Sequence, residues 1–113
     1  MPEVVVPSLR PRPAKKHVSR TCAAHRSWVK RHWCSVRGCT RMPVECAHVR
    51  SGTDAGMGMK PSDRWVISLC QHHHREQHQI GERAFEEQHS LSLKELAEEF
   101  ARQSPFRSKL AHL

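Results

Sequence analysis

The sequence contains no tyrosine, and only three phenylalanines and three tryptophans stand among its 113 residues. Hydrophobic residues make up 37% of the chain, so the core of a single domain of this length is expected to be thin. Such a core often depends on a disulfide or a bound metal for its stability. The composition therefore favours one small domain with a cross-link of this kind.

Long hydrophobic runs are also absent. The longest near the start of the chain is Val4 to Val6, which is far too short for a signal peptide or a membrane span. We therefore expect a cytoplasmic protein with no membrane partner. In the cytoplasm thiols stay reduced, and clustered cysteines indicate metal binding more often than disulfides. The cysteine count of five agrees, because an odd number leaves one thiol over in any disulfide scheme.

Acidic residues are nearly missing from the first part of the chain. Residues 1–44 carry ten Lys and Arg against one acid, Glu3, whereas residues 76–103 carry seven acids against three bases. This uneven distribution of a net charge of +8 favours a polyanionic partner, and nucleic acid is the simplest. The alternative is that the charge serves solubility alone. Residues 1–17 hold four of the seven prolines and predict a disordered basic arm.

Local patterns predict an α+β domain over residues 18–105, with a tail at 106–113. Thr21 is placed to cap a helix that runs to about His32. Short strands are expected within the segments MPVECAHVR and RWVISL, with an irregular glycine-containing loop between them. A helix should follow the second strand and end near Gly81.

The strongest local prediction is a helix close to the C-terminus. Ser92 and Glu95 form a capping box, and Leu91 can contact Leu96 as a hydrophobic staple. The apolar residues that follow recur at the spacing of one helical face, namely Leu93, Leu96, Ala97, Phe100 and Ala101. In so small a domain this face is expected to be core rather than a surface for a partner.

Four histidines lie in the stretch LCQHHHREQH at residues 69–78. On a helix with about 100° per residue, Cys70 and His73 share one side, and His74 and His78 share another about 90° away. His72 projects away from both pairs and is expected to be solvated. One helix can therefore contribute ligands to two separate metal sites.

The first of these pairs needs two more ligands to form a closed zinc site. A Cys-x4-Cys knuckle lies upstream, so the predicted structural zinc site has a Cys3His ligand set, which consists of Cys34, Cys39, Cys70 and His73. The alternative is a group of buried free cysteines. Cys22 and Cys46 are left over as small core residues, although Cys46 could displace one of the four.

The second pair, His74 and His78, leaves coordination positions open, as a catalytic metal requires. Upstream, His48 is expected at the end of a strand, beside Arg50 and a glycine loop. A neutral imidazole there could accept a proton from water that attacks a phosphodiester, while a metal stabilises the leaving oxygen. On its own such a histidine is more often unremarkable in function. Its position between a zinc knuckle and a metal-type helix favours the catalytic interpretation.

The order of these elements over about residues 25–90 resembles the HNH endonucleases of the His-Me finger class. The elements are the knuckle, the strand with AH, the glycine loop with KPSD, the second strand and LC-x2-HH-x3-H. The chain is most similar to the phage-associated branch that includes a recombination-enhancement nuclease. The resemblance implies a small zinc-stabilised ββα-metal fold with flanking helices, encoded by a bacterium or a phage.

The resemblance also implies roles for single residues. His48 matches the general base, His74 the closing histidine of the motif and His78 a second helical metal ligand. The residue before the base often binds the metal, but here it is Ala47. Asp63 takes the place of the middle Asn and is expected either as the third ligand of the catalytic ion or as the group that orients His48. Glu45 is a weaker substitute for the missing ligand.

The sequence thus predicts an HNH endonuclease that hydrolyses DNA phosphodiesters with low sequence specificity. It would use structural Zn2+ and a catalytic Mg2+ or another divalent ion. The basic residues expected to contact phosphates are Arg50, Lys60, Arg64 and Arg75. Two alternatives remain: a non-catalytic zinc-stabilised DNA-binding module, and an accessory protein whose C-terminal helix binds a recombination or phage-packaging partner.

Overall fold

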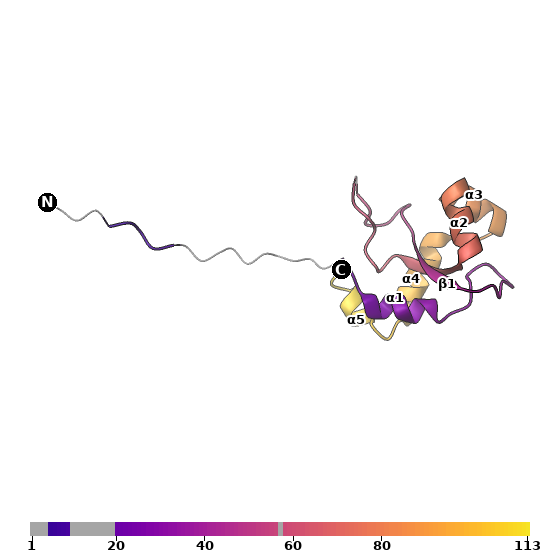
Figure 1. Ribbon diagram of the computed structural model, residues 1–113, viewed down its shortest axis with the longest axis horizontal. Helices are drawn as coiled ribbons and strands as arrows, with labels where there is room; N and C mark the ends of the chain where they lie inside the picture. Colours follow the sequence, from indigo (N-terminus) through magenta and orange to yellow (C-terminus); the bar gives the residue numbers. More distant parts are fainter. Residues whose placement is uncertain (1–4, 10–19, 57) are drawn as a thin grey trace.

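A computed structural model of the protein describes residues 5–9, 20–56 and 58–113. It has a small α+β fold, so the predicted class is confirmed. Its elements in chain order are α1 (Ala23–Lys30), β1 (Val44–His48), β2 (Val66–Cys70), α2 (Gln71–Ile80), α3 (Glu82–His89), α4 (Leu93–Gln103) and α5 (Arg107–Leu110) (Figure 1). In the described part of the chain, no helix has the length and apolar character needed to cross a membrane.

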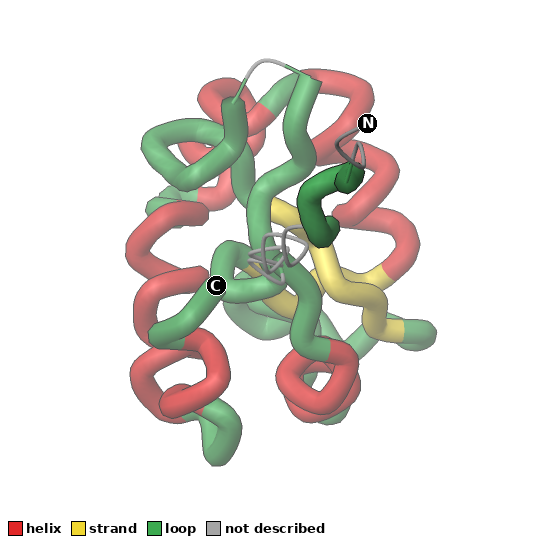
Figure 2. The backbone as a smooth tube through the Cα atoms, turned by 90° about the vertical axis from the view of Figure 1, so that its left-hand side faces the viewer, coloured by secondary structure: helices red, strands yellow, loops and turns green. Residues whose placement is uncertain are grey.

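The two strands form an antiparallel hairpin at the centre of the domain, with helices around it (Figure 2). His48 pairs with Val66 at one end, and Val44 pairs with Cys70 at the other. Side chains alternate between the two faces of a strand, so Cys46 and His48 share one face while Glu45 and Ala47 share the other. All five residues of β2 are buried, which requires that both faces of the hairpin are covered.

Each face of the hairpin meets a different helix. Cys46 Sγ donates a hydrogen bond to the carbonyl oxygen of Arg26, so its face lies against α1. Glu45 contacts His74, so the opposite face lies against α2. On this second side Ala47 joins a hydrophobic core that also includes Ile67, Leu69, Phe85, Leu93 and Ala97.

Helix α4 matches its prediction closely. The Ser92 side chain accepts a hydrogen bond from the Glu95 backbone N–H at 3.4 Å, as an N-cap should. Three members of the predicted stripe are buried, and Leu96 and Phe100 pack against the core at its edge. The stripe is therefore core, as expected.

The structure differs from the predictions at the start of α1 and in the C-terminal residues. Helix α1 is capped by Cys22 rather than by Thr21, so that cap prediction was wrong. Residues 106–113, expected as a tail, contain the short helix α5, and Leu110 is buried with Cys22 and Ala101. The predicted arm at 1–17 lies outside the described residues apart from 5–9, which are exposed.

Candidate metal centre and catalytic cleft

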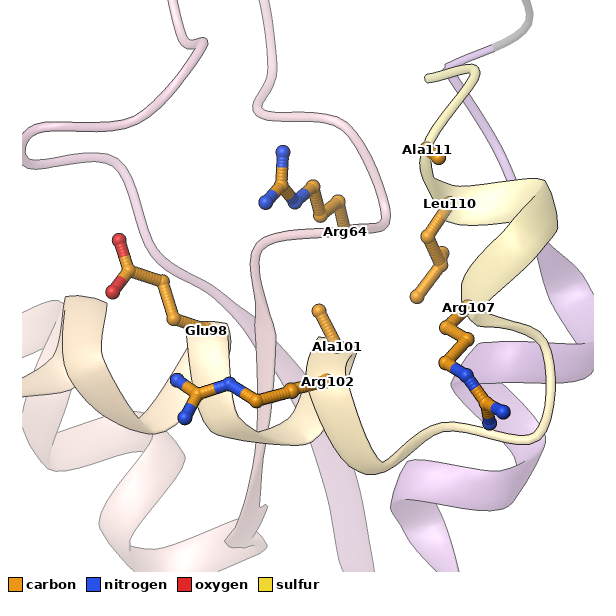
Figure 3. Close-up of a pocket in the computed structure, with 7 residues that line it drawn as sticks. All are labelled: Arg64, Glu98, Ala101, Arg102, Arg107, Leu110 and Ala111. Atoms are coloured by element: carbon orange, nitrogen blue, oxygen red, sulfur yellow. The ribbon is translucent and has the colours of Figure 1, made fainter.

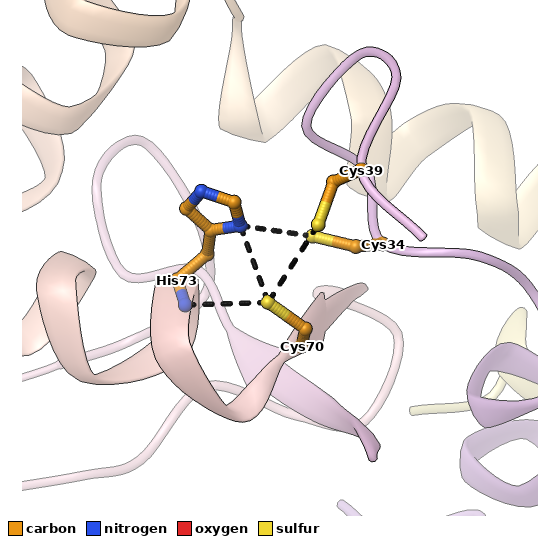
Figure 4. Close-up of side chains that lie close together, drawn as sticks. All are labelled: Cys34, Cys39, Cys70 and His73. Atoms are coloured by element: carbon orange, nitrogen blue, oxygen red, sulfur yellow. Dashed lines mark hydrogen bonds between the residues drawn. The ribbon is translucent and has the colours of Figure 1, made fainter. Parts of the chain in front are cut away.

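The four predicted zinc ligands lie together in the structure (Figure 4). Their ligand atoms all lie within 4.8 Å of one another. Cys39 Sγ is 3.8 Å from Cys70 Sγ, and His73 Nδ1 is 3.2 Å from Cys70 Sγ and 3.4 Å from Cys34 Sγ. A tetrahedral zinc with Zn–S bonds of about 2.3 Å separates its sulfurs by about 3.8 Å. This Cys3His cluster could therefore hold a metal such as zinc.

Two segments build the cluster. The knuckle between α1 and β1 turns at Gly38, whose φ of 77° is in the region that glycine adopts without strain, and brings Cys39 back beside Cys34. Cys70 ends β2 and caps α2, where its sulfur accepts a hydrogen bond from the His73 backbone N–H. One turn of helix then places the His73 ring next to the same sulfur.

The electrostatics of the cluster suit a cation. Burial raises the pKa of Cys34 to about 11, so its thiolate requires a positive partner. Burial acts to raise the pKa of Cys39 too, but hydrogen bonds from the Arg41 backbone and the neighbouring thiols lower it overall. Burial also lowers the pKa of His73, which keeps its imidazole neutral as metal binding requires.

The remaining two cysteines lie outside this group. Cys22 is buried in a second small core near α5. Cys46 donates its thiol hydrogen to a carbonyl of α1, and burial raises its pKa to about 11. Neither belongs to the metal-type cluster. Cys22 is a buried core residue, as predicted, whereas Cys46 is only partly buried.

His48 is held by Asp63. The imidazole Nε2–H donates to Asp63 Oδ1 at 2.9 Å, and the carboxylate is almost fully buried. Its other oxygen, Oδ2, accepts from the Cys22 backbone N–H at 2.7 Å and lies 3.0 Å from Arg26 Nε. Both carboxylate oxygens are thus engaged by the protein, and Nδ1 of His48 is the ring nitrogen that this hydrogen bond leaves for other partners.

The second histidine pair lies on α2, as the helical spacing predicted. The Nε2 atoms of His74 and His78 are 3.2 Å apart. His74 donates its Nδ1–H to Glu45 Oε1 at 2.9 Å. Two nitrogens that bind one ion at about 2.1 Å lie at a similar separation. A carboxylate on the far ring nitrogen is also the usual arrangement for a metal-binding histidine.

Asp63 does not join this pair. Among the described residues, three or more potential metal-ligand atoms come together in the cluster of Cys34, Cys39, Cys70 and His73, to which Asp63 does not belong. The acid beside His74 is Glu45, and it contacts Nδ1 rather than the side of the ring that faces His78. Asp63 is therefore not a third member of the group that His74 and His78 form.

His48 and His78 line one cleft, although they come from different elements. The cleft has a volume of about 280 Å³ and also contacts Arg50, Gln77 and Glu82. On its other side His48 borders a second cleft of about 350 Å³, which Lys60, Arg20 and Arg26 line together with Asp63. The candidate base is therefore accessible from two sides, and basic residues line both.

The other two predicted phosphate contacts lie elsewhere. Arg75 is exposed on α2. Arg64 lines a cleft of about 480 Å³ between α4 and α5, together with Arg102 and Arg107 (Figure 3). The three guanidinium groups point in different directions there, so the cleft does not direct them at one ligand. Of the four predicted contacts, Arg50 and Lys60 thus border the clefts of His48.

Sequence reasoning missed two residues that shape this region. Arg26 faces Asp63 from α1, and its place in the helix gave no signal of that contact. Glu82, the first residue of α3, accepts hydrogen bonds from the backbone N–H groups of Arg50 and Ser51 at 3.0 Å each. Glu82 therefore joins the chain shortly after His48 to the start of α3.

The structure thus defines a small α+β protein with a Cys3His cluster and a separate group of histidines on the same helix. A family described as "Protein of unknown function (DUF968)" matches residues 8–104, and the chain belongs to this family. No curated protein and no solved structure matches it significantly. What the site does chemically is therefore inferred from its own residues.

Proposed function

We propose that the protein is a metal-dependent DNA endonuclease of the HNH type, with β1, β2 and α2 as a ββα-metal unit. The observation that carries the proposal is the position of His48. It is held by the buried Asp63 and borders one cleft together with His78, a histidine of the candidate metal pair. A non-catalytic zinc module would have no need for this arrangement.

His48 is the general base in this proposal. Asp63 accepts the Nε2–H of the imidazole, which fixes the ring and its tautomer, so Nδ1 carries the lone pair. From there it would take the proton of a water molecule that attacks the phosphorus. The nearby negative charge of Asp63 also stabilises the imidazolium that forms, as the acid does in a Ser-His-Asp triad.

His74 and His78 would hold the catalytic divalent ion, Mg2+ or a related metal, through their Nε2 atoms. When bound, such an ion supplies Lewis-acid stabilisation of the leaving oxygen. The charges around the cleft suit a phosphodiester, because Arg50 and Lys60 each line a cleft that His48 borders. In this proposal the basic groups contact phosphates rather than base edges, so we expect low sequence specificity.

Zinc in the Cys3His cluster would have a structural role. All four protein ligands are present, which leaves no open position for a substrate. By joining the knuckle to the first turn of α2, this zinc would fix the helix that carries His74 and His78.

The test is plasmid cleavage with Mg2+, Mn2+ and Ni2+ by the zinc-loaded protein and by two variants. His48→Ala should reduce the rate by about 10²–10⁴, the usual contribution of a general base. His72→Ala is the matched control, because His72 is exposed on α2, outside both clefts of His48. It should cut at the wild-type rate.

Two outcomes would contradict the proposal. Cleavage by His48→Ala at the wild-type rate would remove His48 as the base. A wild-type protein that binds one zinc and DNA but never cuts, with any of the three ions, would identify a non-catalytic DNA-binding module. Complex formation with a recombination or packaging protein in the absence of any nicking would favour the accessory role instead.

A further inference from the structure

The knuckle that carries Cys34 and Cys39 also exposes a group of side chains that the proposed catalytic chemistry does not use. We call Arg31, Trp33, Arg37 and Arg41 the knuckle surface. All four are exposed, and none lines a cleft that His48 borders. No acid occurs between Glu3 and Glu45, so this segment has a single sign of charge.

Trp33 is the unusual member of the surface. Its side chain is 64% exposed, in a protein with three tryptophans and a thin core. The other two are engaged: Trp28 packs against Phe100, and Trp65 lies under the guanidinium of Arg64. Within residues 20–56 and 58–113, Trp33 has no aromatic or cationic partner of this kind.

The backbone that carries Trp33 is nevertheless fixed. Its carbonyl oxygen accepts a hydrogen bond from Ser68 Oγ at 2.8 Å, and the next residue, Cys34, is a buried member of the metal-type cluster. The indole is therefore a large apolar face on a rigid support. The backbone at this position therefore loses little conformational freedom when a ligand covers the ring.

Three arginines of the same segment supply its positive charge. Arg31, Arg37 and Arg41 make no ion pair with any carboxylate in the described part of the chain. Cys34 and Cys39 lie together in the metal-type cluster, so the segment between them forms a loop. Trp33 directly precedes this loop, and Arg41 follows it by two residues. One short segment thus carries an exposed indole and three exposed arginines, and this segment lies at the end of the folded domain away from α5 (Figure 1).

We infer that the knuckle surface binds unpaired nucleotides of DNA, with a base stacked on Trp33 and the flanking phosphates on the arginines. Proteins that bind single strands combine these two features, a stacking platform and a basic track. The bases of an intact duplex are already stacked on one another, so an exposed indole favours DNA with a single-stranded segment. The inference takes DNA as the ligand from the proposed function and narrows the substrate to this class.

The test measures binding to a fluorescently labelled oligothymidine and to a duplex of equal length by anisotropy. The zinc-loaded full chain is used with His48→Ala and without other divalent ions, so no cleavage can occur. In this background Trp33→Ala should weaken binding to the single strand by about 5- to 150-fold, the range for loss of one base stack. Trp33→Phe, which keeps an aromatic face, should retain most of the affinity.

Ile80→Ala is the matched control, since Ile80 is an exposed apolar residue at the far end of α2, and it should bind as before. Arg37→Ala should lower the slope of log K against log salt by about 0.7. Equal losses for single strand and duplex in Trp33→Ala, or no loss at all, would overturn the inference. If Trp33→Ala loses its zinc, a second measurement replaces it, in which tryptophan fluorescence is recorded as single-stranded DNA is added. The DNA must quench the emission of the protein with Trp33 more than the emission of Trp33→Phe.

Failure of this inference and failure of the proposed function are distinguishable. The binding assay involves no cleavage, so its result stands whether or not the protein cuts DNA. Where the protein does cut, Trp33→Ala should raise KM for substrates with unpaired segments and leave kcat unchanged. His48→Ala should lower kcat with little effect on binding.

Discussion

The sequence allowed two roles for Asp63, as a metal ligand or as the group that orients His48, and its contacts favour the second. Its carboxylate accepts hydrogen bonds from His48 Nε2 at 2.9 Å and from the Cys22 backbone N–H at 2.7 Å, and Arg26 Nε lies 3.0 Å away. Both oxygens are therefore engaged before any ion binds. We expect Asp63→Asn to slow cleavage strongly while the affinity for the second metal stays unchanged.

The size of the effect follows from the hydrogen bond to His48. An amide keeps the shape of the side chain but removes its charge, and its single oxygen can accept from His48 or from the Cys22 backbone N–H but not from both. Replacement of the tautomer-fixing acid in a protease triad lowers kcat about 10⁴-fold. We expect a loss of about 10²–10⁴ here, at every concentration of Mg2+ or Mn2+. The free energy of unfolding should fall by about 1.5–3 kcal/mol, the usual contribution of a hydrogen bond to a charged group.

The assay combines calorimetric titration of Mn2+ into zinc-loaded protein with cleavage rates over a range of Mn2+ concentrations. Asp54→Asn is the matched control, because Asp54 lies in the same loop and binds Ser62 through its carboxylate, at 2.9 and 2.6 Å. It should lose stability but keep its rate. If Asp63→Asn binds Mn2+ at least 10-fold more weakly and high Mn2+ restores cleavage, Asp63 is a ligand and the reasoning fails.

Two further predictions concern zinc and pH. Cys70→Ser should lose the structural zinc and cooperative unfolding, since such sites contribute about 10–16 kcal/mol of binding energy to folding. The control Cys46→Ser should keep both. Unchanged zinc content of Cys70→Ser by mass spectrometry would contradict the predicted zinc site. Burial lowers the pKa of His25 below 6.5, against an opposing influence of Asp63, so the folded chain keeps it neutral while the unfolded chain protonates near that pH. The free energy of unfolding should therefore fall as the pH drops below 6.5, by up to about 1.4 kcal/mol per unit from this group, and His25→Gln should flatten that slope in urea titrations.

The grouping of the histidines could be predicted because it depends on helical geometry alone. Cys70, the N-cap of α2, meets His73 at one place, while His74 and His78 meet at another, as residues three and four apart on a helix do. The proximity of Cys34 and Cys39 could be predicted equally well, since a Cys-x4-Cys turn brings its two thiols together whatever surrounds it. These are local relations, and tertiary packing had little power to change them.

The acidic residues that contact the histidines could not be predicted in this way. Asp63 follows an irregular loop, and no periodicity tells which histidine such a loop will reach. Glu45 meets His74 because one face of β1 lies against α2, a relation that depends on the packing of the hairpin. The start of α1 was misplaced for the same reason: the backbone N–H of Cys22 is bound by the distant Asp63, a contact that local capping preference at Thr21 does not include.

The segments at both ends of helix α2 are tied to other parts of the chain, and this explains how so thin a core can position the candidate histidines. At its start, the Cys3His cluster joins Cys70 and His73 to the knuckle. At its end, Gly81 leads into Glu82, whose carboxylate accepts from the backbone N–H groups of Arg50 and Ser51, two and three residues after the end of β1. His78 lies on the last turn before Gly81, and His48 ends β1, so Glu82 links the segments that follow these two histidines. Preorganisation here comes from a metal-type cluster and one charged side chain rather than from the area of buried apolar surface.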